Sequence, residues 1–130
     1  MCEYIGDGAF VNSNFSEALN LPVCEQIGEY AFVNSNFSDA LSLPACTYIG
    51  DGAFYYSIFS GSLNLPACTY IGDRAFYNSN FTQITIGANA TLGGGCIGDR
   101  STTFINDYNA NGKLAGTYVW DSVSQHWIYQ

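Results

Sequence analysis

Acidic side chains recur in this 130-residue chain at one fixed interval. The members of this acidic column are Asp7, Glu29, Asp51 and Asp73, each 22 residues after the one before. Stacked carboxylates repel one another unless water or cations screen them, so the column is either a solvated polar edge or a calcium site. We favour the solvated edge, because calcium loops gather several carboxylates within one short segment. A second run, Glu17 and Asp39, does not help, since Gly61 and Gln83 follow it.

Cysteine recurs at the same interval, at Cys2, Cys24, Cys46 and Cys68. Stacked neighbours would lie about 5 Å apart, the spacing of adjacent strands. Disulfides can span that distance, but a uniform column gives no reason to prefer one pair. We predict free, buried thiols that act as small hydrophobic groups, with one or two bridges between neighbouring rows as the alternative. Zinc is disfavoured because ligands in a line do not converge tetrahedrally, and we expect no cofactor.

Catalytic groups are scarce in the sequence. His126 is the only histidine, and no nucleophile elbow, phosphate loop or paired acid and base is present. We therefore expect no enzymatic activity. With 11 acidic and 3 basic residues the net charge is −8, so the chain would repel nucleic acid. No apolar run approaches the roughly 18 to 20 residues that span a bilayer, so we expect no membrane insertion.

A 22-residue repeat places these columns. Residues 24–45 match residues 2–23 at 16 of 22 positions, and the pattern continues through two further rows, 46–67 and 68–87. Repetition at one short period predicts a solenoid, in which each row is stable only when stacked on its neighbours. We expect one domain, with the solenoid over 1–87 and a decayed row and C-terminal cap over 88–130.

Each row divides into a short strand and an irregular half. Alternation at 18–21, 40–43 and 62–65 predicts strands that stack into a parallel sheet and end at a proline. The glycines Gly6, Gly28, Gly50 and Gly72 suit a corner with positive φ or a close backbone approach between rows. The serines equivalent to Ser13 are expected to bond backbone groups. Two phenylalanine columns fill the predicted interior: Phe10, Phe32, Phe54 and Phe76, and Phe15, Phe37, Phe59 and Phe81.

These residues resemble a known family. The phrase Ile-Gly-Asp-x-Ala-Phe, followed by a short Leu-x-Leu-Pro strand, is similar to the BspA-like leucine-rich repeat of bacterial and some protozoan surface proteins. The resemblance covers roughly residues 2 to 87. It implies a leucine-rich-repeat-like right-handed coil of short parallel strands, and an extracellular or cell-surface location, with any signal or anchor outside this chain.

The repeat decays after Phe81. Residues 88–95 are too glycine-rich for us to expect another row there. Residues 97–100 have the same sequence as residues 71–74, Ile-Gly-Asp-Arg, and we interpret them as a decayed fifth row. We predict a short helix over 104–109 and a terminal hairpin from 115–120 and 126–129. The expected core of this cap is Tyr118, Trp120 and Trp127.

Tyrosines mark where the rows differ. The candidate ligand surface consists of Tyr4, Tyr48, Tyr70, Tyr55, Tyr56 and Tyr77. Tyrosines in a column can bind a sugar ring or a protein strand. The alternative is a structural role, in which they only cover the wall of the solenoid. The motif for N-glycosylation also occurs, at Asn14, Asn36, Asn80 and Asn89.

Two functions fit this sequence. The first is an adhesin-like module that binds a protein or glycan on another cell or matrix, and the second is a spacer within a longer array. The first row carries no cap, so Ile5, Phe10, Phe15, Leu19 and Leu21 should be partly exposed beside an unpaired strand edge. We expect either an end-to-end homodimer or a preceding segment, because Met1 opens directly inside a repeat.

Overall fold

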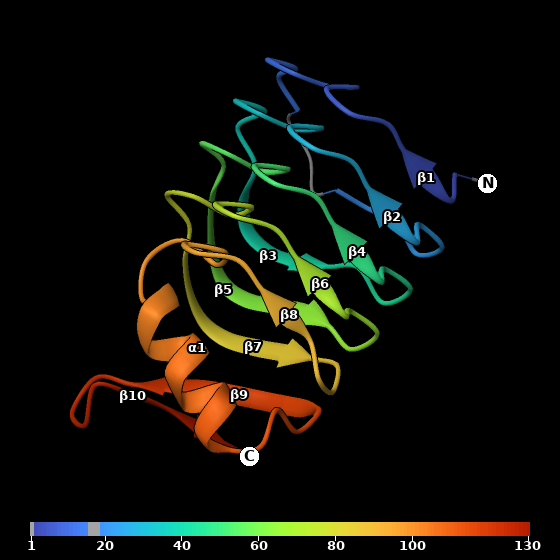
Figure 1. Cartoon of the computed structure of the whole chain (residues 1–130). Coiled ribbons are helices and arrows are strands. Elements are labelled where there is room, and N and C mark those ends of the chain that lie inside the picture. The colour runs from blue at the N-terminus through green and yellow to red at the C-terminus, as the bar shows by residue number, and fades with distance from the viewer. Residues whose placement is uncertain (1, 16–18) are drawn as a thin grey trace.

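The computed structural model describes residues 2–15 and 19–130, and they form a coil of stacked rows (Figure 1). The N-terminus lies at one end of the stack, and a helix and a hairpin lie at the other. The second, third and fourth rows each contribute one strand to each of two sheets, and the first and fifth rows contribute a strand to the first sheet. Residues 16–18 lie outside the described ranges, so the position of Glu17 is not described. Residues 19–21, the described part of the strand predicted at 18–21, do not form a strand.

The first sheet is built from two-residue strands, which run parallel in the order β1-β2-β4-β6-β8. They are β1 (Tyr4–Ile5), β2 (Gln26–Ile27), β4 (Tyr48–Ile49), β6 (Tyr70–Ile71) and β8 (Thr91–Leu92). The sequence pattern predicts only an irregular wall here. Two residues are too few for a readable alternation, and the strands become visible only when the rows stack.

The second sheet has the order β10-β9-β7-β5-β3. Its strands are β3 (Ser38–Ser42), β5 (Ile58–Leu65), β7 (Asn80–Ile86), β9 (Gly116–Asp121) and β10 (His126–Tyr129). The first three pair in parallel, as predicted. β3 begins two residues and β5 four residues before the predicted strands at 40–43 and 62–65. Together the two sheets confirm the predicted repeat solenoid of mainly β structure.

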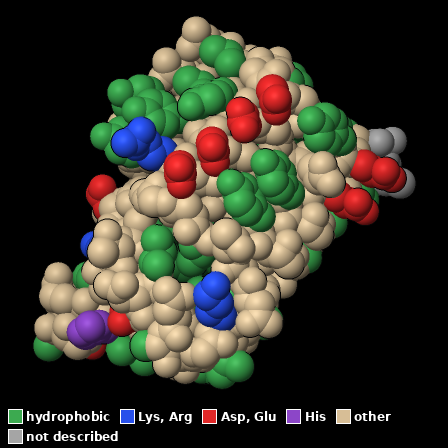
Figure 2. Space-filling view, in the orientation of Figure 1, with side chains coloured by type: hydrophobic (Ala, Val, Ile, Leu, Met, Phe, Trp, Pro, Cys, Tyr) green, Lys and Arg blue, Asp and Glu red, His purple; other side chains and the backbone are tan. Residues whose placement is uncertain are grey.

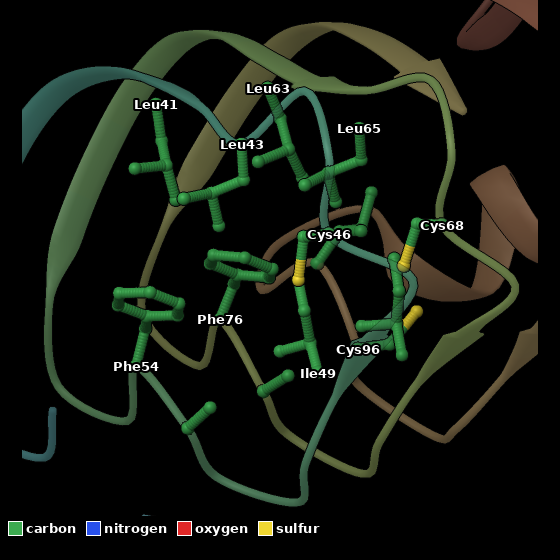
Figure 3. Close-up of a cluster of buried hydrophobic side chains, with 14 of the residues drawn as sticks. Leu41, Leu43, Cys46, Ile49, Phe54, Leu63, Leu65, Cys68, Phe76 and Cys96 are labelled. Carbon is green, nitrogen blue, oxygen red and sulfur yellow. The ribbon is translucent and has the colours of Figure 1, made fainter. Parts of the chain in front are cut away.

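The interior is filled by the predicted columns of aromatic and aliphatic side chains. Phe32, Phe54 and Phe76 stack with ring centroids 5.1 Å apart and planes within 5°. The second phenylalanine column meets the first edge-on. Figure 3 shows the Phe54 and Phe76 rings together with leucine and cysteine side chains pointing into one shared interior. Ser35, Ser57 and Ser79 are buried beside them, and Ser35 donates to the Phe10 carbonyl as expected.

The first row is only partly covered, because nothing in the described residues stacks on it. Phe10 is 40% exposed, and Phe15, Leu19 and Leu21 are half-buried. The expectation for Ile5 is wrong, since only 5% of its surface is exposed. It lies in β1, whose pairing with β2 places it in register with the buried Ile27.

The repeat glycines serve close approach and not positive φ. A Cβ on Gly50 would lie 2.7 Å from the Glu29 nitrogen, and one on Gly72 would lie 2.5 Å from the Asp51 nitrogen. Real Cβ atoms do not approach backbone so closely. Each row therefore rests on the row before it at a glycine.

The fifth row differs from the prediction. The glycine-rich segment does form a row, since Thr91 and Leu92 pair with Tyr70 and Ile71. The alignment of Ile97–Arg100 with Ile71–Arg74 is therefore wrong. Glycine is tolerated at this point because the row is anchored by backbone bonds, such as Gly93 N–H to the Ile71 carbonyl at 2.8 Å.

The chain ends in helix α1 (Ser101–Ala110) and the hairpin of β9 and β10. The helix begins three residues before the predicted start, and the hairpin is confirmed. β9 pairs antiparallel with β7 and so covers the last edge of the second sheet. Tyr118 and Trp127 are buried, while Trp120 is half-buried under the Arg100 guanidinium, 4.6 Å from the ring centroid.

Candidate functional site

The six candidate tyrosines form two groups on the surface. Tyr4, Tyr48 and Tyr70, the sheet tyrosines, lie on β1, β4 and β6. The turn tyrosines are Tyr55, Tyr56 and Tyr77, which follow the buried Phe54 and Phe76. Within each group every ring is exposed or half-buried, from Tyr4 at 59% to the half-buried Tyr55 and Tyr70.

Stacking holds most of these rings in place. The Tyr48 and Tyr70 centroids lie 4.8 Å apart with planes within 7°, and Tyr55 and Tyr77 stack at the same distance. Tyr56 meets Tyr55 edge-on, with centroids 4.3 Å apart. Tyr4 stands apart, because Gln26 occupies the position between it and Tyr48.

The acidic column runs between the two groups and has a structural role that the sequence does not suggest. Asp7 accepts the Glu29 N–H at 2.8 Å, Asp51 the Asp73 N–H at 2.9 Å, and Asp73 the Gly94 N–H at 3.0 Å. Three of the four carboxylates therefore tie their row to the next one. Figure 2 shows acidic side chains in a line with hydrophobic side chains on both sides. Burial, and then the negative charges of Glu29, Asp51 and Asp7, raise the pKa of Tyr48.

No cluster of three or more potential metal ligands occurs within 2–15 and 19–130. His126 contacts Asp107 at 3.0 Å, and Asp107 also accepts the Trp127 N–H at 2.7 Å. This group joins the hairpin to helix α1. In the described part of the chain, no helix has the length and apolar character needed to cross a membrane.

All five cysteines are free. Cys24, Cys46 and Cys68 are buried, as predicted, but Cys2 is exposed, because it lies at the uncovered end of the column. Cys96 is also buried, in the fifth row, where its carbonyl accepts the Phe76 N–H as the Ala75 carbonyl accepts the Phe54 N–H. Burial raises the pKa of Cys46 and Cys96 to about 12 and that of Cys68 to about 11. The interior thiols are therefore neutral and unreactive near neutral pH.

Alkaline pH should destabilise the protein through these three thiols. In the unfolded chain they lose their protons near the ordinary pKa of 9.0, whereas the folded state retains them. Their stabilising contribution is therefore complete below pH 9 and is lost as pH rises toward 11. The free energy of unfolding, measured by urea titration under reducing conditions at pH 8, 9 and 10, should fall by roughly 1 kcal/mol per pH unit per thiol above pH 9.

Two variants control this experiment. Replacing Cys46, Cys68 and Cys96 together by Ala should reduce the fall in unfolding free energy above pH 9. Cys2→Ala should leave that fall unchanged, because Cys2 is exposed. An identical pH profile in the triple variant would contradict the assignment.

The predicted ligand surface leaves out Tyr30 and Arg74, although position 30 is one of those where the rows differ in sequence. Tyr30 is 52% exposed, and both residues have positive φ, at 55° and 54°. Tyr56 shares this feature with a φ of 64°, where the other rows have asparagine. Aligning the rows would have shown bulky residues replacing glycine, but the backbone conformation that makes this unusual is visible only in the structure.

The stacked rows, the two parallel sheets and the inward columns together define a leucine-rich-repeat-like solenoid. The family model described as the BspA type leucine rich repeat region matches residues 1–102 in six copies, and the chain belongs to this family. The match extends past residue 87 into the fifth row. No curated protein and no solved structure matches the chain. Membership is consistent with a surface repeat module, and repeats of this kind are typically non-enzymatic.

Proposed function

We propose that this chain is a recognition module of a cell-surface or secreted protein, and that it binds a protein or glycan through its exposed tyrosines. The single observation that carries the proposal is the placement of six tyrosines on two neighbouring faces of a rigid coil. The scaffold does not need them, because other rows carry Gln26, valine or asparagine at the same positions.

Stacked tyrosines suit recognition for an energetic reason. A tyrosine side chain has two torsions and a large amphipathic surface, so it gives contact area at low entropic cost. In the stacked pairs the neighbouring ring already restricts these torsions before any ligand binds. The acidic column between the groups adds hydrogen-bond acceptors for a polar partner.

Replacing Tyr48 and Tyr70 together by Ser should weaken ligand binding about tenfold, through loss of aromatic contact area. The ligand is first sought by glycan array and by pull-down, and its affinity for the variant is then measured by calorimetry. Thr47→Ser with Thr69→Ser is the matched control, since both threonines are exposed in the same rows. Unchanged affinity would contradict the sheet tyrosines as the site, and a module without any ligand would favour the spacer function.

A second copy of this chain is the proposed partner for the open first row. Phe10 is 40% exposed, and its inner face stacks on Phe32 at 5.2 Å. Its outer face can stack on the same ring of another copy. Light scattering over a concentration series should show a dimer that Phe10→Ser converts to monomer. A wild-type monomer at every concentration would contradict this.

A further inference from the structure

One turn position is left-handed in every row. It lies two residues after the repeat glycine and has φ between 54° and 68°. Its occupants are Gly8, Tyr30, Gly52, Arg74 and Gly95. Glycine adopts this conformation freely, whereas any other residue pays about 1–2 kcal/mol. Because the glycine rows form the same turn, the side chains of Tyr30 and Arg74 are not needed to build it.

The two bulky residues alternate with glycine for a steric reason. A Cβ on Gly52 would lie 2.5 Å from Cε1 of Tyr30, and one on Gly95 would lie 3.5 Å from Cγ of Arg74. Each large side chain therefore extends over the glycine of the following row. The absence of a side chain at Gly52 and Gly95 leaves room for Tyr30 and Arg74 on the surface.

Two hollows lie beside these side chains. The first has a volume of about 360 Å³ and is lined by Tyr30, Asp51, Gly52, Tyr55, Asp73 and Arg74. The second has a volume of about 500 Å³, and its lining includes Asp73, Arg74, Tyr77 and Asp99. Both hollows are thus lined by Arg74 and Asp73, and each contains a turn tyrosine.

The lining combines donors, acceptors and aromatic rings. Arg74 forms no ion pair with the described residues, so its guanidinium donors are available. Asp51 and Asp73 each accept a backbone N–H at Oδ1, while Oδ2 accepts no hydrogen bond from the described part of the chain. Tyr30 and Tyr55 supply apolar ring surface next to these polar groups.

We propose that the two hollows bind consecutive units of a neutral oligosaccharide. Sugar units present apolar C–H surfaces to aromatic rings and hydroxyl groups that both donate and accept hydrogen bonds. An acidic saccharide would meet Asp51, Asp73 and Asp99 on a chain of net charge −8. This inference rests on the proposed recognition function and specifies its ligand class as a glycan.

The test uses variants that restore the residue of the glycine rows. Tyr30→Gly and Arg74→Gly should each weaken binding of the neutral oligosaccharides that bind wild type on an array of neutral and acidic glycans. We expect the affinity of each variant to fall about tenfold, because each substitution removes contacts to the sugar. The thermal unfolding midpoint should stay unchanged or rise, since glycine relieves the left-handed backbone. Asn12→Gly, a left-handed position outside both hollows, is the control and should bind as wild type.

Several outcomes would overturn this inference. They are wild-type affinity in both glycine variants, binding of acidic glycans alone, and binding of proteins but no glycan. If replacing Tyr48 and Tyr70 by Ser abolishes binding while the glycine variants bind normally, the recognition function stands and the hollows are not its site. If no glycan and no protein binds, both proposals fail.

Discussion

Phe54→Ala should lower the free energy of unfolding by about 3–5 kcal/mol, the usual loss for a buried phenylalanine. Phe54 is fully buried in the middle of the coil. It stacks between Phe32 and Phe76, and its edge contacts the second column at Phe37 and Phe59. Removing the ring interrupts both columns at once and leaves a cavity that the stacked rows cannot close. Urea unfolding at pH 7, followed by tryptophan fluorescence, measures the loss.

The matched control is Phe10→Ala, the same change at the same position of the first row. Phe10 is 40% exposed and has a stacking partner on one side only, Phe32. Phe10→Ala should lower the free energy of unfolding by less than half as much as Phe54→Ala, when both are measured at low protein concentration. If Phe54→Ala prevents folding, Phe54→Leu should give an intermediate loss. Equal losses at Phe10 and Phe54 would contradict a continuous core that is open at one end.

Gly72→Ala should destabilise the protein by at least about 2 kcal/mol, because an added methyl group has no space. Its Cβ would lie 2.5 Å from the Asp51 nitrogen and 2.7 Å from the Asp51 Cα. It would also meet the carboxylate that accepts the Asp73 N–H. The rows would have to separate, which weakens the backbone bonds of both neighbours. Thermal unfolding by circular dichroism should show the lower midpoint.

Gly6→Ala is the control for this second prediction. Gly6 lies in the first row, and the nearest atom to an added Cβ is Cε1 of Tyr4 at 3.9 Å. We expect a stability change between zero and a gain of about 0.5 kcal/mol, since alanine restricts the unfolded chain. A loss at Gly6 equal to that at Gly72 would mean that row contact is not the reason for the glycine.

The candidate site was only partly predictable. The sequence identifies Tyr48 and Tyr70 as a column, and the structure shows that their rings stack at 4.8 Å. The sequence does not show that the acidic column bonds the backbone of the next row, because that contact joins residues 22 positions apart. Nor does the sequence show that Tyr30 and Arg74 line hollows, since exposure and turn conformation depend on neighbouring rows.

The sequence by itself determined the solenoid and its inward columns. A period of 22 residues places the same residue types at the same point of every row, so phenylalanine, leucine and cysteine must stack on their own kind. The tertiary structure alone decided the features that arise between rows. These are the sheet of two-residue strands, the close approach at the glycines, and the glycine-rich fifth row at Thr91–Leu92. Each of these features depends on contacts between backbone atoms of adjacent rows, and the periodicity of side-chain types does not predict such contacts.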